Sequence, residues 1–370
     1  MKVLFITNKS FIRKSDFGGA QCAKRNYDLL VSVYGIENIR YIIMSDEVDN
    51  SENDGLGITV KIKNSNIAKY LNLLFWRDCF SLSAKKIISN YVKEVDPDVV
   101  FFDGSSFGFL GKIVPKHAHK IVFYHNIEKC YAWSRVANTS LLCLIKYFSF
   151  WANEKYITRT ADVRICLNER DEKLLQKHYK IVADYILPIS FTNIVKDHDY
   201  TERMPTGMLL FVGSNFMPNV KGITWFCKNV MPYVDKKLMI VGKKMELLRK
   251  ELETDKIEVI GTVNNLEDYY DQADAMVMPI FVGDGMKVKT AEALMYGKPM
   301  FATDEALEGY DVEGISGIYR CNSAKEFIDM INEQIINGYS EEVRKLFVHN
   351  YSTERNKDRF ENFLKEKGIV

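Results

Sequence analysis

Short runs of consecutive apolar residues alternate along this chain with longer segments of helical period, and the alternation forms two series. The first series comprises residues 2–7, 39–44, 98–103, 120–125 and 162–166, and the second comprises residues 208–214, 236–242, 256–263, 275–280, 298–303 and 317–321. Runs rich in β-branched and aromatic residues between helices are typical of strands buried on both faces of a parallel sheet. The pattern therefore predicts an α/β protein with two doubly wound, Rossmann-like domains.

A polar and charged stretch from about Pro188 to Gly207 separates the two series and predicts a linker. We therefore expect one domain in residues 1–190 and the other in residues 207–351. Two domains of this kind make the cleft between them the default ligand site. The tail, residues 351–370, has the period of a helix.

The composition is that of an ordinary globular protein, with 47% hydrophobic and 27% charged residues in 370. Seven cysteines are scattered without C-x-x-C spacing, so neither a disulfide framework nor a zinc site is indicated, and a reduced, cytoplasmic setting fits best. The amino terminus has only a five-residue apolar run, and no stretch approaches 18 apolar residues. We therefore expect neither a secretion signal nor a membrane-spanning helix.

Charge is distributed unevenly. Residues 1–195 contain 27 Lys and Arg against 20 Asp and Glu, a net charge of +7, whereas residues 196–370 contain 23 against 29, a net charge of −6. The stretches 67–80 and 140–159 combine bulky apolar residues with Lys and Arg. Two interpretations stay open: a peripheral surface on the inner face of a membrane, or core packing on a plain solvated domain. We expect no nucleic-acid partner.

Residues 283–299, GDGMKVKTAEALMYGKP, contain the most informative chemistry. The glycines allow close approach of a ligand to the backbone, and a helix amino terminus after them offers unpaired N–H donors and a positive dipole end. Lys287 and Lys289 add positive charge, and Glu292 in the second helical turn is an acceptor suited to hydroxyl groups. A site for phosphates beside hydroxyls indicates a nucleotide-sugar.

The same segment resembles the donor-binding signature of glycosyltransferase family 4, the retaining GT-B enzymes, in which two acidic residues lie eight positions apart. Here they are Asp284, where the family usually has glutamate, and Glu292. The resemblance implies a GT-B fold and a metal-independent hexosyltransferase that uses a UDP- or GDP-type sugar and no further cofactor. It also implies that the last helix, residues 352–370, packs back on the amino-terminal, acceptor-side domain.

The resemblance extends to single residues elsewhere. It implies catalytic roles for Gly19, His125, Lys221 and Asp284, and donor binding by Gly18, Gly213, Ser214, Asn264, Gly285, Met286, Lys287, Val288, Lys289 and Glu292. Ser214 stands where the family usually has an arginine that neutralises the leaving diphosphate. Either Lys287 replaces that cation or the activity is reduced. The pairs Asp96-x-Asp98 and Asp197-x-Asp199 are interpreted as turns and not as a metal site.

The expected function is transfer of a sugar from a nucleoside diphosphate to a glycan, a lipid-linked glycan or a protein. Two alternatives remain open. One is a catalytically silent GT-B subunit that binds glycan or a partner, and the other is a sugar-nucleotide epimerase on the same fold.

Overall fold

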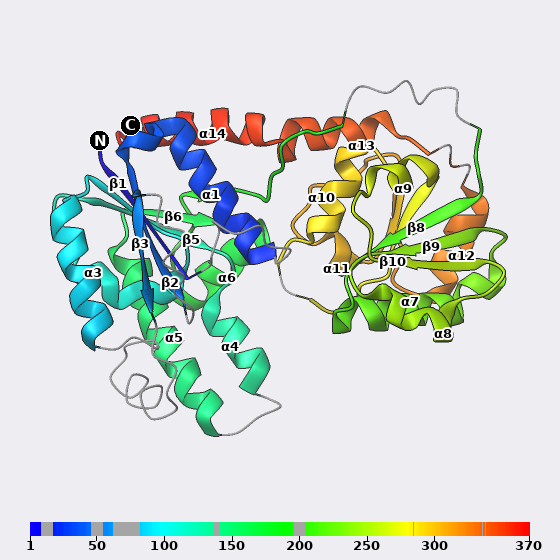
Figure 1. Ribbon diagram of the computed structural model, residues 1–370, viewed down its shortest axis with the longest axis horizontal. Coiled ribbons are helices and arrows are strands. Elements are labelled where there is room, and N and C mark those ends of the chain that lie inside the picture. Colours follow the sequence, from blue (N-terminus) through cyan, green and yellow to red (C-terminus); the bar gives the residue numbers. More distant parts are fainter. Residues whose placement is uncertain are drawn as a thin grey trace. The chain divides into compact units, whose positions relative to one another are not determined.

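The computed structural model describes residues 1–8, 18–45, 55–61, 82–136, 141–195, 204–283, 285–334, 336 and 338–370. The chain divides into two compact units. The first unit comprises Met1–Pro188 together with Lys357–Val370, and the second comprises Ile189–Asn356 (Figure 1).

The first unit contains a seven-stranded parallel sheet in the order β3-β2-β1-β4-β5-β6-β7. Its strands are β1 (Val3–Thr7), β2 (Ile39–Ser45), β3 (Gly57–Lys61), β4 (Val99–Phe102), β5 (His119–Tyr124), β6 (Val163–Cys166) and β7 (Tyr185–Ile186). Its helices are α1 (Gly18–Tyr34), η1 (Ile36–Asn38), α3 (Leu82–Val95), η3 (Ser105–Lys112), α4 (Glu128–Val136), α5 (Leu141–Thr160), α6 (Glu169–Tyr179) and most of α14 (Thr353–Glu366). Five of these strands coincide with the first series of apolar runs, and β3 and β7 are additional.

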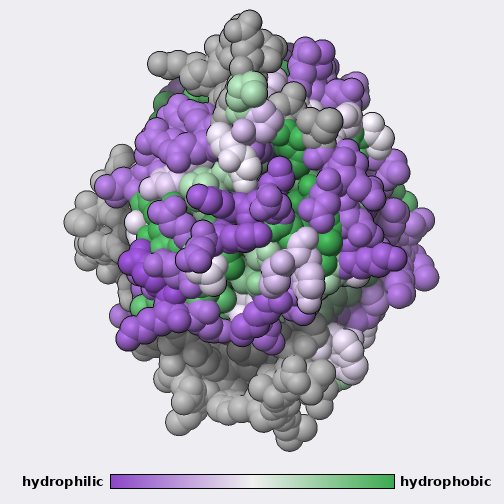
Figure 2. All heavy atoms as spheres, turned by 90° about the vertical axis from the view of Figure 1, so that its right-hand side faces the viewer, coloured by the Kyte–Doolittle hydropathy of each residue, from purple (hydrophilic) through white to green (hydrophobic). Residues whose placement is uncertain are grey.

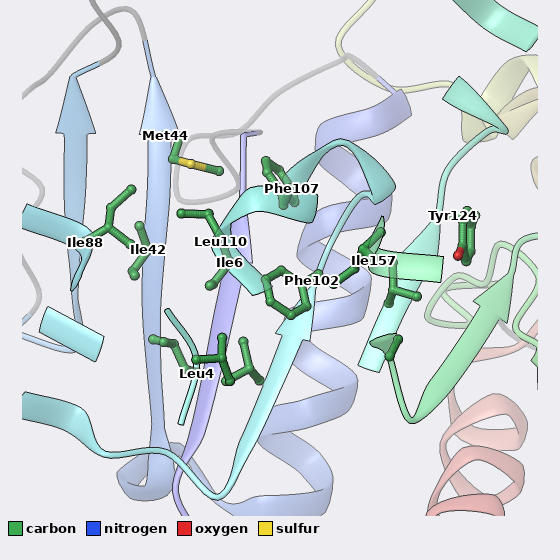
Figure 3. Close-up of a cluster of buried hydrophobic side chains, with 14 of the residues drawn as sticks. Leu4, Ile6, Ile42, Met44, Ile88, Phe102, Phe107, Leu110, Tyr124 and Ile157 are labelled. Atoms are coloured by element: carbon green, nitrogen blue, oxygen red, sulfur yellow. The ribbon is translucent and has the colours of Figure 1, made fainter. Parts of the chain in front are cut away.

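Both faces of this sheet are covered, because successive side chains of a strand point to opposite faces. Leu4 and Ile6 of β1 belong to a core with residues of α3, η3 and α5 (Figure 3). Phe5 of the same strand lies on the other face, where its ring packs against Tyr27 of α1 and Phe101 of β4. Continuous apolar runs are thus required along each central strand, which explains why the pattern was visible in the sequence.

The carboxyl-terminal residues complete the first unit. The Phe363 ring of α14 stacks on Tyr185 of β7 at 4.5 Å. Ile369 accepts a hydrogen bond from the Tyr34 hydroxyl at its carbonyl oxygen, at 3.2 Å, and is itself buried. The hydrophobic core of the unit that begins at Met1 therefore includes residues near position 360.

The second unit contains a six-stranded parallel sheet in the order β10-β9-β8-β11-β12-β13. Its strands are β8 (Met208–Val212), β9 (Lys237–Val241), β10 (Ile257–Gly261), β11 (Ala275–Met278), β12 (Met300–Ala302) and β13 (Ile318–Arg320). Its helical segments are α7 (Met217–Asn229), η4 (Met231–Tyr233), η5 (Met245–Leu248), α8 (Arg249–Leu252), α9 (Glu267–Gln272), α10 (Val288–Met295), α11 (Asp304–Leu307), α12 (Ala324–Glu333), α13 (Glu341–Leu346) and the π-helical η6 (Phe347–Tyr351). All six strands coincide with the second series of apolar runs, and both sheets confirm the predicted fold class.

Candidate functional site

Each sheet has a topological switch point, where the strand order reverses and where open α/β sheets bind ligands outside the carboxyl ends of the strands. In the second unit this point lies between β8 and β11. The loop after β8 begins with Gly213 and Ser214, and the segment after β11 leads into the glycine loop, here defined as residues 283 and 285–287. The sequence-predicted donor site therefore lies at the switch point of its sheet.

The glycine loop presents a helix amino terminus. Gly285 has φ +66°, a backbone conformation that favours glycine. Lys287 is the N-cap residue of α10, and its own side chain makes no capping hydrogen bond. The Tyr310 hydroxyl donates a hydrogen bond of 2.6 Å to the Lys287 carbonyl oxygen and so fixes the backbone there. The first N–H groups of a helix suit an anion, although the Thr290 N–H of α10 already donates to the Lys287 carbonyl oxygen at 3.0 Å.

The charged side chains around α10 form two ion pairs. Lys287 Nζ lies 2.6 Å from Glu305 Oε1 and donates to the Gly285 carbonyl oxygen at 2.8 Å. Lys289 Nζ lies 2.7 Å from Glu292 Oε2, which also accepts a hydrogen bond from the Tyr270 hydroxyl at 3.3 Å. Sequence reasoning singled out both lysines and Glu292 but not Glu305 or Tyr270.

The loop after β8 is tied to the loop after β9. Asn215 donates from its backbone N–H to the Lys243 carbonyl oxygen at 2.9 Å and from Nδ2 to the Lys244 carbonyl oxygen at 3.0 Å. Ser214 is exposed. Two lysines that the sequence analysis did not consider, Lys243 and Lys244, therefore lie in the loop after β9, whose backbone is hydrogen-bonded to the residue that follows Ser214.

The remaining predicted residues of the second unit differ in their exposure. Lys221 is exposed on α7, and Asn264 is exposed after β10. Met286 is buried, and Val288 is the first residue of α10. Asp284 lies outside the described residues.

In the first unit, side chains from three adjacent strand ends form a buried cluster at the switch point between β1 and β4. Asp103, which follows β4, accepts hydrogen bonds from Thr7 Oγ1 at 2.8 Å and from Asn26 Nδ2 at 2.7 Å. His125, which follows β5, lies with Nε2 2.9 Å from Asp103 Oδ1. Because a carboxylate can only accept, this contact requires the ring proton on Nε2. His125 was predicted from the sequence, whereas the partners that orient it were not.

Cys22 on α1 lies beside this cluster. Burial alone would raise the pKa of its thiol, but the Arg25 guanidinium and His125 lower that pKa to about 7. Arg25 Nη2 is 3.2 Å from the Cys22 sulfur. The first turns of α1 therefore place a cation and an ionisable thiol next to His125.

The residues just after His125 are fixed by a buried carboxylate. Glu154 of α5 accepts hydrogen bonds from the backbone N–H groups of Glu128 and Lys129, at 2.8 and 3.1 Å, and so caps the start of α4. It also accepts from Ser105 Oγ at 2.7 Å and from the Tyr179 hydroxyl at 2.6 Å. Burial raises the pKa of Glu154. These contacts fix the backbone at Glu128 and Lys129, directly after the strand end that carries His125.

Gly18 and Gly19, to which the resemblance assigns donor-binding and catalytic roles, are the first two residues of α1. They are thus backbone groups at a helix amino terminus. Among the described residues, no group of three or more His, Cys, Asp or Glu is arranged to hold a metal ion. Within the same part of the chain, no helix is both long and apolar enough to cross a membrane.

One known protein family matches the part of the chain that contains the glycine loop. Residues 206–337, within the second unit, match the family described as Glycosyl transferases group 1. No curated protein has a sequence that matches the chain.

Solved structures of similar fold match nearly the whole chain. Sucrose-phosphate synthase from Thermosynechococcus elongatus has a TM-score of 0.68 and 14% identity, covering 100% of this chain and 99% of that one. HepE from Anabaena, solved with UDP and glucose, has a TM-score of 0.65 and 12% identity, covering 99% of each chain. WaaG, a glycosyltransferase involved in lipopolysaccharide biosynthesis, has a TM-score of 0.58 and 17% identity, covering 99% and 98%. The chain has a GT-B fold built from two Rossmann-like domains.

Proposed function

We propose that this protein is a retaining glycosyltransferase of family 4 that moves a hexose-type sugar from a nucleoside diphosphate to an acceptor without a metal ion. The observation that carries the proposal is the glycine loop. A helix amino terminus, two lysines and the carboxylate of Glu292 lie at the switch point of the sheet, inside the segment that matches the group 1 family.

We assign a role to each group of the second unit from its charge. Lys287, Lys221 and the amino terminus of α10 would stabilise the negative charge that develops on the departing diphosphate. Glu292 would accept hydrogen bonds from ribose hydroxyls, and Asp284 with the amides of residues 285–289 would orient the sugar. Gly213, Ser214 and Asn264 would line the nucleotide side of this second, donor-binding unit. The relatives solved with UDP or UDP-glucose support a donor of this class.

The first unit would supply the acceptor side. His125 has a fixed ring orientation because Asp103 holds Nε2 and Cys22 lies within hydrogen-bonding reach of its side chain, and this cluster would face the substrates. Gly18 and Gly19 at the start of α1 would let a substrate approach the backbone.

A panel of UDP-, GDP-, ADP- and dTDP-sugars tests the proposal by thermal shift. A ligand at 100 times its dissociation constant stabilises the folded protein by about 2.7 kcal/mol, which raises the melting temperature measurably. We expect the nucleotide-sugars of one base to raise the melting temperature more than the others. The absence of any shift across the panel, with no nucleotide release on turnover, would contradict the assignment.

Turnover separates the alternatives. A silent subunit would bind a donor or glycan and release no nucleoside diphosphate, and an epimerase would convert the donor without an acceptor. The substitution at Ser214 motivated the first alternative. Lys287 at the glycine loop offers a cation in place of that arginine, and this makes an active enzyme the better interpretation.

We further propose that the first unit contacts an anionic membrane through α4 and α5, which pack against each other (Figure 1). The rings of Trp133, Tyr147, Phe148 and Trp151 form a continuous series, in which Trp133 is 57% and Phe148 47% exposed. Lys129 and Lys155 lie over the Trp151 ring. Exposed aromatic rings beside lysines suit a membrane interface. The other stretch expected at such a surface, 67–80, lies outside the described residues.

Replacing Trp133 and Phe148 together by serine should abolish sedimentation with anionic liposomes at low salt while leaving the melting temperature within a few degrees, because both rings are exposed. Tyr233→Ser, a change at a 67% exposed ring of the second unit, is the matched control. Figure 2 shows that hydrophilic residues cover much of one side of that unit. Equal binding of the double variant and the wild type would show that these rings pack within the protein and do not contact the membrane.

A further inference from the structure

The ammonium group of Lys287 already has an anionic partner within its own domain. Its Nζ is 2.6 Å from Glu305 Oε1, and the side chains are only 17% and 22% exposed. The same Nζ donates to the Gly285 carbonyl oxygen, so the side chain is folded back over the glycine loop. The cation nearest the amino terminus of α10 is thus neutralised before any ligand arrives.

Steric surroundings favour this folded-back position. A Cβ atom added at Gly283 would lie 2.9 Å from Lys287 Cε and 3.4 Å from Glu305 Oε1. A side chain at position 283 would therefore require the end of the Lys287 side chain to shift. The Lys287 backbone is held by Tyr310, so a change of partner requires rotation of the lysine side chain alone.

Glu305 is also held in place. It lies in the short helix α11, whose start is capped by Thr303 Oγ1 accepting from the Ala306 N–H. Thr290 Oγ1 of α10 donates to the Ala306 carbonyl oxygen at 2.7 Å and joins the two helices. The carboxylate therefore stays beside the glycine loop and opposes any second anion that binds there.

We infer that the Glu305 carboxylate competes with the diphosphate of the donor for Lys287 and thereby limits how tightly this protein holds a nucleoside diphosphate. The inference rests on the proposed function of the glycine loop. An incoming diphosphate takes the lysine from Glu305, and the carboxylate recovers it when the product leaves. The ion pair thus favours release of the nucleoside diphosphate product, and it also lowers the affinity for the donor.

Glu305→Gln tests this directly, because glutamine keeps the shape and removes the charge. We expect UDP or GDP, whichever the wild type binds, to bind about tenfold more tightly by isothermal titration calorimetry, since the anion no longer displaces a charged hydrogen bond. Inorganic pyrophosphate, which has no base, should also bind more tightly to the variant than to the wild type. Glu313→Gln removes one charge from an 88% exposed side chain that pairs with Arg320, and it should change neither affinity.

The gain must depend on Lys287. Lys287→Ala should weaken binding, and Glu305→Gln in that background should recover less than twofold. A Glu305→Gln affinity equal to or weaker than that of the wild type, or an equal gain without Lys287, would overturn the competition while leaving the glycosyltransferase assignment intact. Failure of the wild type to bind any nucleoside diphosphate would overturn both.

Discussion

Replacing Glu292 by alanine is expected to weaken nucleotide-sugar binding about 10- to 100-fold. A charged acceptor shared by two ribose hydroxyls is worth roughly 1.5–3 kcal/mol for each hydrogen bond lost. The structure adds that Glu292 is oriented before binding, because Lys289 and the Tyr270 hydroxyl hold Oε2, and the Tyr270 ring stacks on Tyr296 at 4.2 Å. A pre-oriented acceptor loses little entropy when it binds.

Titration calorimetry with the best donor measures the effect. Glu292→Gln retains an acceptor oxygen and should lose less affinity than the alanine variant. Asp268→Asn, at an exposed position on the neighbouring helix α9, serves as the control for a lost negative charge. Unchanged affinity in Glu292→Ala would remove this residue from the donor site.

Replacing Glu154 by alanine is expected to lower the free energy of unfolding of the first unit by roughly 3–5 kcal/mol, because four hydrogen-bond donors lose their acceptor and each buried donor left unpaired costs about 1–3 kcal/mol. Two of those donors are the backbone N–H groups that begin α4, so the segment following His125 should also lose order. Urea unfolding monitored by tryptophan fluorescence and circular dichroism measures the change.

Glu169→Ala is the matched control. This glutamate is on the surface helix α6, and its side chain is 74% exposed and pairs with Lys173 at 3.5 Å, an interaction worth at most about 1 kcal/mol. Comparable losses in the two variants would show that the network around Glu154 contributes no more than a solvated ion pair.

Much of the fold was predictable because both sheets are buried on both faces. The central strands must then be apolar at consecutive positions, and the runs at residues 2–7 and 208–214 show this directly. Strands β3 and β7 escaped prediction for physical reasons. Strand β3 is half-exposed at the sheet edge, and β7 has two residues, so neither needs a long apolar run.

The candidate site was predictable only where its residues are neighbours in the sequence. Glu292, Lys287 and Lys289 share one short segment, whereas Glu305 pairs with Lys287 from helix α11. Asp103 is 96 positions from Thr7 and 22 from His125, yet parallel strand order places all three at adjacent strand ends. A one-dimensional pattern contains no signal for contacts that the order of strands creates.

The discontinuity of the first unit in sequence has a consequence for how the protein is made. Residues 189–356 are contiguous, so the second unit has all its own residues as soon as they leave the ribosome. The first unit must wait for Phe360, Phe363 and Ile369, although it begins at the amino terminus. During synthesis, the part of the first unit around β7 therefore stays uncovered until the whole second unit has been translated. Folding of the first unit is complete only when the last residues of the chain have been made.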